Sequence, residues 1–323
     1  MSGNVYATGD FKDTVDFDPS IAILNLTSNG GYDIFILKLD ISGNFIWAKS
    51  IGGTDWDRGR SITTDASGDV YVTGTFEDTT DFDPGVAVFD LMSNGSSDVF
   101  SLKLDSSGDF IWAKSMGGLS NDIGTSVTTI DTGHVFVTGH YHGTADFDPG
   151  SAIFNLTSNG GFDVFIQELD AQGNFIWGTS FGAESSDYSF SIATDAKNQV
   201  YVSGSYFFTV DFDPGPVTFD MTSCSHLDVF ILKLSQSIVG IAENTMLNRI
   251  SIFPNPNNGL VNIDFVNFKE VSIKVYSAIG QLVYQKENII TSVHQFELIG
   301  MPGVYIVEVS SKGEKQRYKL VKN

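Results

Sequence analysis

Paired aspartates at a fixed spacing are the residues of this chain with the clearest capacity for chemistry. The string Asp-Phe-Asp-Pro occurs four times, and it supplies Asp16, Asp18, Asp81, Asp83, Asp146, Asp148, Asp211 and Asp213. Carboxylates two residues apart suit hard cations such as Ca²⁺, which takes about six to eight oxygen ligands. Asp side chains also cap their own turns, and the intervening Phe would then pack inward. The spacing therefore leaves two interpretations open, a calcium site and a set of turn caps.

A second set of acids shares the spacing. The steps from Asp57 to Asp122 and from Asp122 to Asp187 equal the step from Asp16 to Asp81. These three acids follow the fourth strand of the repeat described below, on the side from which the Asp-Phe-Asp-Pro loops also leave. We therefore expect both sets on one exposed acidic face.

Histidine and cysteine offer weaker signals. His134, His140 and His142 form a group, but the equivalent positions of the preceding repeat hold other residue types, so surface histidines are a simpler interpretation than a metal site. Cys224 is the only cysteine, which excludes an intrachain disulfide and a cysteine zinc site. Its place in a loop favours an incidental thiol over a nucleophile.

The tryptophans and the common catalytic motifs complete the candidates. Trp47, Trp112 and Trp177 recur with the same step, and this regularity favours packing between repeats over sugar stacking. The chain contains no Gly-x-Ser-x-Gly elbow and no Gly-x-x-x-x-Gly-Lys phosphate loop. Because carboxylates are abundant, a glycosidase pair stays open, although near-identical repeats argue against one specialised site.

The elements that position these residues form an internal repeat with a period of about 65 residues, the step from Asp16 to Asp81. One period contains four aromatic and β-branched runs bounded by turn residues, which is typical of strands; they are 61–64, 70–73, 98–104 and 110–115. An insertion from about 77 to 96 separates the second and third runs. Without it the repeat has about 45 residues, the size of a four-stranded β-propeller blade.

These runs resemble the bacterial SBBP repeat, a family of seven-bladed β-propellers. The resemblance rests on Gly-Asp-Val-Tyr-Val-Thr-Gly at 68–74, Asp-Val-Phe-x-Leu-Lys-Leu-Asp at 98–105 and Gly-Asp-Phe-Ile-Trp at 108–112, followed by Gly-Gly. It covers about Gly3–Ser235 and implies an all-β fold with a partial or incomplete β-propeller of about four blades. The first and fourth strands occur three times and the other two four times, so we expect the natural protein to continue upstream of Met1.

Charge divides the chain into two parts. The net charge is −21, from 39 acids and 18 bases. Residues 250–323 carry eight Lys or Arg and six Asp or Glu, so the acidity belongs to the first part. This excess excludes nucleic acid as a partner, because such binding needs basic patches. No apolar run reaches the length of about 18 residues that a membrane span needs. We expect repeats over 1–235, a linker over 236–249 and a second domain over 250–323.

The second domain resembles the type A C-terminal sorting domain of the type IX secretion system. Its seven or so short strands predict a small immunoglobulin-like β-sandwich. The matching motifs are Phe-Pro-Asn-Pro at 253–256, Ile-Lys-Val-Tyr at 273–276, Gly-Gln-Leu-Val at 280–283, Met-Pro-Gly-Val-Tyr-Ile-Val at 301–307 and the final Lys-Leu-Val-Lys-Asn. The resemblance implies a Bacteroidota protein, the type IX machinery as partner, and a sorting signal that includes Pro254, Asn255, Pro256, Gly280, Gly303, Tyr305, Lys319 and Asn323.

Together these features predict a secreted or cell-surface protein that binds an extracellular ligand, a glycan or a cationic protein. The alternatives are a secreted polysaccharide-active enzyme and a passive spacer that displays an upstream domain. Proteins with such a sorting domain carry a signal peptide. Met1–Gly9 has no basic region followed by an apolar core, so we expect that the leader is missing from this chain.

Overall fold

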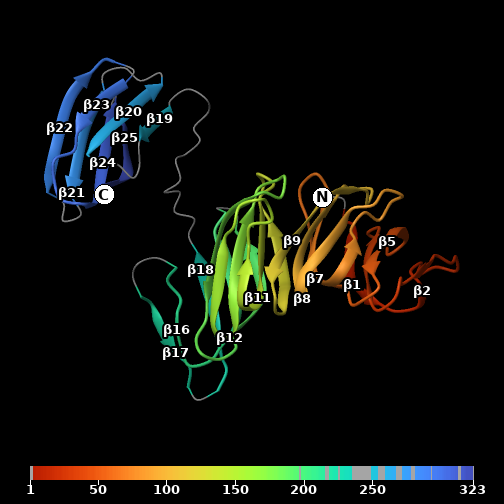
Figure 1. Ribbon diagram of the computed structural model, residues 1–323. Coiled ribbons are helices and arrows are strands. Elements are labelled where there is room, and N and C mark those ends of the chain that lie inside the picture. Colours follow the sequence, from red (N-terminus) through yellow and green to blue (C-terminus); the bar gives the residue numbers. More distant parts are fainter. Residues whose placement is uncertain are drawn as a thin grey trace. The chain divides into compact units, whose positions relative to one another are not determined.

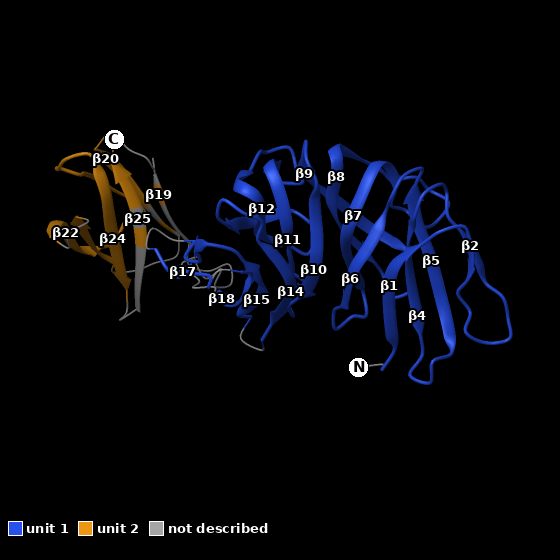
Figure 2. Ribbon diagram, turned by 90° about the horizontal axis from the view of Figure 1, so that it is seen from below, with its two compact units in different colours: residues 1–236 blue, residues 237–323 orange. Residues whose placement is uncertain are grey.

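The computed structural model describes residues 3–195, 198–214, 218–224, 226–234, 249–253, 259–266, 271–277, 281–291, 293–311 and 314–322. The chain divides into two compact units, Met1–Gln236 and Ser237–Asn323 (Figure 1, Figure 2). All of the regular secondary structure in these ranges is β-strand, so the all-β prediction is confirmed. Most of the predicted linker at 236–249 lies outside the described residues.

Unit 1, residues 1–236, is built from antiparallel meanders of strands that follow one another in the sequence. Two of the meanders have four strands. One contains β6 (Arg58–Thr64), β7 (Val70–Asp81), β8 (Asp90–Leu104) and β9 (Phe110–Gly118). The next contains β10 (Asp122–Thr129), β11 (Val135–Asp146), β12 (Asn155–Leu169) and β13 (Phe175–Phe181).

Two further meanders flank these and have three described strands each. The one before them contains β1 (Val5–Phe11), β4 (Asp33–Leu39) and β5 (Phe45–Gly53). The one after them contains β14 (Tyr188–Thr194), β15 (Val200–Tyr206) and β18 (Asp228–Leu234). Among the described residues the former has no equivalent of β6 and the latter none of β9, which agrees with the copy numbers predicted for the four strands.

The Asp-Phe-Asp-Pro insertion is a hairpin that prolongs the second and third strands of each meander. In the four-stranded meanders the strands run on into it, and Asp81 pairs with Asp90. In the flanking meanders it forms separate ribbons, β2 (Thr14–Asp16) with β3 (Asn25–Thr27) and β16 (Thr209–Asp211) with β17 (Asp220–Thr222). A register shift near Asp78, where φ is 54°, sets the hairpin off from the sheet. Such a bulge bends the strand that carries it.

Neighbouring meanders are joined both by pairing and by packing. The glycines at 52–53 pair with Thr80 and Asp81 of β7, and those at 117–118 pair with 145–146 of β11. The core lies between the meanders: Ile34 of β4 belongs to the same buried cluster as Val72 and Phe100 of the next meander. Two further clusters connect the later meanders in the same way.

The repeated tryptophans take part in this packing, as predicted. Trp112 is 8% exposed, and its Nε1 donates to the carbonyl oxygen of Ala171 in the next meander at 3.1 Å. The Trp47 Nε1 donates in the same way to the carbonyl oxygen of Ser106 at 3.3 Å. The third member, Trp177, packs against the last cluster of unit 1. The sugar-stacking alternative is therefore not needed to explain their spacing.

The first strands of successive meanders form a row. β6 and β14 lie on either side of β10, and β1 lies beside β6. Figure 2 shows β14, β10 and β6 in this order along unit 1. Since these strands come from equivalent positions of three repeats, the row brings equivalent residues next to one another.

Unit 2, residues 237–323, consists of two antiparallel sheets around one core. One sheet has the order β19 (Arg249–Phe253), β20 (Leu260–Val266), β23 (Val293–Glu297). The other has the order β22 (Leu282–Ile289), β21 (Val271–Ser277), β24 (Gly303–Ser311), β25 (Glu314–Lys322). Ile263 of the first sheet and Ile273 and Val307 of the second are fully buried in the same cluster. The predicted sandwich is present in this form, and its immunoglobulin-like topology stays a prediction.

Candidate functional site

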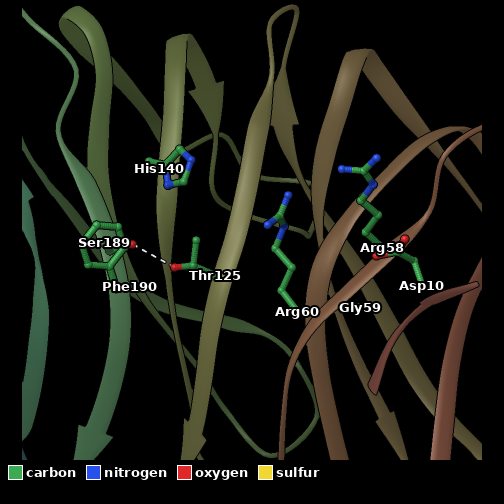
Figure 3. A pocket seen from close by; sticks show the side chains of 8 residues that line it. All are labelled: Asp10, Arg58, Gly59, Arg60, Thr125, His140, Ser189 and Phe190. Atoms are coloured by element: carbon green, nitrogen blue, oxygen red, sulfur yellow. Dashed lines mark hydrogen bonds between the residues drawn. The ribbon is translucent and has the colours of Figure 1, made fainter. Parts of the chain in front are cut away.

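A pocket of about 520 Å³ opens where the first strands of the meanders meet. It is lined by residues from β1, β6, β10, β11 and β14, namely Asp10, Arg58, Gly59, Arg60, Thr125, His140, Ser189 and Phe190 (Figure 3). The volume lies within the range of about 300–1,000 Å³ that is usual for small-molecule sites.

Several of the lining positions hold different residue types in successive repeats. Arg60, Thr125 and Phe190 occupy one position in three successive repeats, and Asp10 and His140 occupy another. At both positions each residue differs from the others in charge, polarity or size. The Asp-Phe-Asp-Pro string, by contrast, is copied without change in all four repeats. The pocket is therefore a unique site on a repeating framework.

Arg58 is held in place by aromatic rings. Its Cζ lies 4.8 Å from the ring centroid of Trp56 and 5.8 Å from that of Tyr32. These two rings meet edge to face at 5.8 Å. The Arg58 Nε is buried and has no hydrogen-bond partner among the described residues. The guanidinium group is thus oriented before any ligand arrives and keeps an unused donor.

Arg60 and His140 interact across the pocket. In the view of Figure 3 the guanidinium group of Arg60 lies between His140 and Arg58. Loss of hydration and the positive charge of Arg58 lower the pKa of Arg60, and Asp10 opposes this effect. Burial, with a smaller contribution from Arg60, lowers the pKa of His140 to about 4. The imidazole is therefore neutral at neutral pH.

Neutral His140 presents one donor and one acceptor nitrogen. Its Nδ1 is buried without a hydrogen-bond partner among the described residues. Its ring is fixed by edge-to-face contacts with Phe162 and Tyr188, whose centroids lie 5.2 and 5.0 Å away. The ring therefore has little freedom to turn.

Hydroxyl groups and one apolar ring complete the lining. Thr125 Oγ1 lies 3.0 Å from Ser189 Oγ and also donates to the carbonyl oxygen of Thr138 at 3.1 Å. Phe190 is 60% exposed, unlike the aromatic residues of the core, and forms an apolar wall. The pocket can therefore hold an anion, bond to hydroxyl groups and cover one apolar face of a ligand.

The aspartates of the Asp-Phe-Asp-Pro hairpins act as turn caps. Asp81 Oδ1 accepts from the N–H groups of Asp83 and Phe89 at 3.0 and 2.8 Å, and Asp83 Oδ1 accepts from Gly85 at 2.7 Å. The same bonds are made by Asp16, Asp18, Asp146, Asp148 and Asp211. Asp213 lies at the corresponding place in the last hairpin.

In three of the four motifs the Phe is buried, as the cap interpretation requires, and Phe17 of the first is half-buried. Phe82 and Phe147 are fully buried, and Phe212 is 4% exposed. In the part of the chain that the structure describes, no group of three or more His, Cys, Asp or Glu is placed to share a metal ion. Calcium binding at these hairpins stays a prediction.

The second set of acids is not on the surface, which corrects the expectation of one exposed acidic face. Asp57 and Asp122 are fully buried, and Asp187 is 1% exposed. They accept backbone N–H groups inside the turn that precedes β6, β10 or β14; Asp57 Oδ2, for instance, accepts from Gly53 at 2.6 Å. The sequence placed Asp57 and Asp187 correctly between strands, whereas Asp122 begins β10. It could not show that the next meander buries all three.

Burial affects the acidity of these side chains and of two further acids, Asp98 within β8 and Asp163 within β12. Burial raises the pKa of Asp57 and Asp98 to about 6 and of Asp122 and Asp163 to about 7. Asp33 adds to the effect at Asp57, and Asp98 adds to it at Asp122. Each meander junction thus encloses two acids within electrostatic reach of one another.

The remaining histidine and cysteine candidates, apart from His140, do not line the pocket. His134 Nδ1 is 2.7 Å from Glu168 Oε1, so His134 bonds within its own meander, whereas His140 lines the pocket and His142 is exposed. Cys224 is exposed, and its backbone N–H donates to Asp228 Oδ2 at 2.9 Å. The sequence analysis did not single out Arg58 and Arg60. Both could have been noticed, because the equivalent positions of the other repeats hold no arginine.

The residues of the sorting motif are only partly described. Gly303 begins β24, and Tyr305, 6% exposed, donates its hydroxyl to the carbonyl oxygen of Met301 at 2.7 Å. Lys319 pairs with Ile306 in β25 through its backbone. Pro254, Asn255, Pro256, Gly280 and Asn323 lie outside the described residues.

Comparison with known proteins identifies the second unit. Residues 251–323 match the family of secretion system C-terminal sorting domains. The sorting domain predicted from the sequence is therefore confirmed, and it implies a secreted or cell-surface protein that engages the type IX secretion system. No helix of the described residues is long and apolar enough to cross a membrane.

Two curated proteins resemble part of the chain. An uncharacterized WD repeat-containing protein of Acanthamoeba polyphaga mimivirus is 28% identical over 191 residues, and the regulatory protein FlaEY of Caulobacter vibrioides is 28% identical over 172 residues. These matches cover 54% and 53% of this chain but only 13% and 17% of the two relatives. A solved protein of unknown function from Bacteroides caccae aligns over 90% of this chain and 98% of its own, with 10% identity and a TM-score of 0.23.

Proposed function

We propose that this chain is an extracellular or cell-surface binding protein, exported through its sorting domain, whose meanders form part of a β-propeller and whose ligand occupies the Arg58–Arg60–His140 pocket. One observation carries the proposal: the two arginines of residues 1–236 line one pocket together with Asp10 and His140. A passive spacer gives no reason for these charged and polar side chains to be gathered around one cavity.

The side chains that line the pocket favour a ligand-binding protein over a passive spacer. The Arg58 guanidinium group is oriented by aromatic contacts, and Asp10, Arg60 and His140 add further charged and polar groups to the same lining. Hydrogen bonds to charged groups contribute about 1.5–3 kcal/mol each, so a polar ligand placed between these side chains gains free energy on binding.

A thermal-shift screen tests the proposal. Wild-type protein and Arg60→Gln are screened against one panel of mono- and oligosaccharides, organic acids and inorganic anions at millimolar concentration. We expect at least one compound to raise the melting temperature of the wild type and to have a smaller effect on the variant, because ligands stabilise the state that they bind. The bound compound should be recovered unchanged, which separates binding from turnover.

Lys49→Gln is the matched control for charge. Lys49 also belongs to unit 1, does not line the pocket, and forms an ion pair with Asp109 at 3.6 Å. If no compound stabilises the wild type, or if every active compound stabilises Arg60→Gln equally, the pocket is not the binding site and the proposal is wrong.

A further inference from the structure

We infer that the pocket binds a single carboxylate carried on a hydroxylated ring, that is, one acidic sugar residue. This inference deepens the proposed function and depends on it. Four features of the lining define the ligand: the guanidinium pair, the net charge, the hydroxyl-bonding groups and the exposed apolar ring.

The guanidinium pair identifies an anion. Arg58 and Arg60 are the only arginines of residues 1–236, and both line this pocket. The planar fork of a guanidinium group matches the two oxygens of a carboxylate, a geometry that a lysine cannot offer. Arg58 is already held against Trp56, and its Nε lacks a partner among the described residues. An anion between the two arginines would also relieve their mutual repulsion.

The net charge of the lining limits this anion to one negative charge. Two guanidinium groups and the Asp10 carboxylate leave the pocket with a net charge of +1, because His140 is neutral at neutral pH. A dianion such as phosphate would exceed this charge and would meet Asp10. The first part of the chain is strongly acidic, so a polymer with one charge per residue would be repelled outside the pocket.

The other polar groups require hydroxyls on the ligand. Asp10 can only accept hydrogen bonds while it is ionised, and neutral His140 offers one donor and one acceptor. Thr125 and Ser189 add two hydroxyls that are 3.0 Å apart. A bare carboxylate such as acetate would use the arginines and make no contact with the other groups. A ring with several hydroxyl groups pairs with them.

The exposed ring explains the ligand's shape. Phe190 is 60% exposed in the lining, and it faces a cavity of about 520 Å³. Covering an exposed apolar ring with the C–H face of a sugar removes apolar surface from water, worth roughly 25 cal/mol for each Å² buried. A small inorganic anion cannot make this contact.

Isothermal titration calorimetry with D-glucuronate tests the inference on the full chain. Glucose, acetate, inorganic phosphate and an oligogalacturonate are titrated in parallel. We expect glucuronate to bind at least about tenfold more tightly than glucose or acetate, since a charge-assisted hydrogen bond contributes about 1.5–3 kcal/mol. The oligogalacturonate should bind more weakly than the monomer at low salt.

Two variants assign this binding to the pocket. Arg60→Gln should lower glucuronate affinity by about tenfold or more, while Lys49→Gln, with the same loss of charge, should leave it unchanged. Asp10→Asn raises the charge of the lining to +2, so it should strengthen acetate and phosphate binding and reduce the preference for glucuronate.

Other outcomes of these titrations would contradict the inference in different ways. If acetate or phosphate matches glucuronate and Arg60→Gln abolishes both, the sugar ring is not recognised, and only the proposed pocket function remains. If glucose matches glucuronate, the acidic class is wrong. If no probe binds, the acidic-sugar inference is overturned, and the wider screen decides on the pocket. If glucuronate binds equally to wild type and Arg60→Gln, the inference is wrong because the site lies elsewhere.

Discussion

Replacing one buried acid should change how the stability of unit 1 depends on pH. Asp163 begins the part of β12 that matches the third strand of each repeat, and it is 1% exposed. Its Oδ2 accepts from the N–H of Asn159 at 3.1 Å, and its Oδ1 has no partner among the described residues. Asn can keep the first bond and place its amide nitrogen at the unpaired position. Asp163→Asn therefore removes the charge with little change of shape.

The magnitude follows from the shift in acidity. Burial, with a smaller contribution from Asp187, raises the pKa of Asp163 from 3.8 to about 7. Each pKa unit corresponds to about 1.4 kcal/mol, so an ionised Asp163 costs the folded state about 4 kcal/mol at pH 8. At pH 5 the folded side chain is protonated while the unfolded one is not, and the cost falls to about 2 kcal/mol. The side chain alone should make unit 1 about 2–3 kcal/mol more stable at pH 5 than at pH 8.

The direction of the pH dependence follows from the direction of the pKa shift. A carboxyl whose pKa is raised by folding stabilises the fold fully below 3.8 and ceases to do so as the pH rises through about 7. Asp57, Asp98 and Asp122 act in the same direction. His140 acts in the opposite direction, because burial lowers its pKa to about 4 and the unfolded chain takes up its proton first. Comparing variant with wild type cancels these shared contributions.

Urea unfolding followed by tryptophan fluorescence is the assay. All four tryptophans lie between Trp47 and Trp177, so the signal reports on unit 1 alone. Asp163→Asn should lose about 2–3 kcal/mol of the pH dependence between pH 5 and pH 8. Asp131→Asn removes one charge from an exposed turn and should retain the full pH dependence of the wild type. If Asp163→Asn also retains it, the buried carboxyl does not carry the raised pKa and the reasoning fails.

Three further predictions concern the scaffold, the hairpins and export. A Cβ added to Gly117 would lie 2.4 Å from the Asp98 Cγ, so Gly117→Ala should cost about 1–3 kcal/mol in urea unfolding, against little for Gly178→Ala, whose nearest contact is 3.3 Å. The calcium prediction requires that millimolar Ca²⁺ raises the melting temperature and that Asp81→Asn with Asp83→Asn reduces the gain; equal melts in calcium and chelator would leave these acids as turn caps. Deleting 250–323 should retain the protein in the cell envelope, and a secretion assay that finds the truncated protein at the surface would contradict the role of the sorting domain.

Local pattern was sufficient to predict most of the strands. The runs at 98–104 and 110–115 lie within β8 and β9, and the turn chemistry between them marked the hairpin correctly. The insertion was not recognised as a continuation of β7 and β8, because its polar residues and the bulge at Asp78 interrupt the strand pattern. The positions of the Trp and Phe residues were predicted from their period, since a repeat must bury its apolar face against its neighbour.

The pocket was harder to predict from the sequence, because it depends on contacts between repeats. Arg60 of β6 and His140 of β11 belong to different repeats and are far apart in the sequence, and β10, which contacts both strands, brings them to one pocket. The burial of Asp57 has the same origin. Its carboxylate accepts from Thr80 Oγ1 of the following strand at 2.9 Å, a contact that no local pattern contains.

The repeated acids and the unique pocket are two consequences of the same packing. Asp98 and Asp163 press against Gly117 and Gly182, where a Cβ would overlap the carboxyl group, so these positions accept only Gly while the Asp keeps its place. Residues that fix the junction in this way must be copied in every repeat. The side chains at Arg60 and at its equivalents in β10 and β14 face the pocket instead, and the junction places no such demand on them. They are therefore free to differ, and a ligand with several kinds of polar group can be recognised at the one place where three similar strands meet.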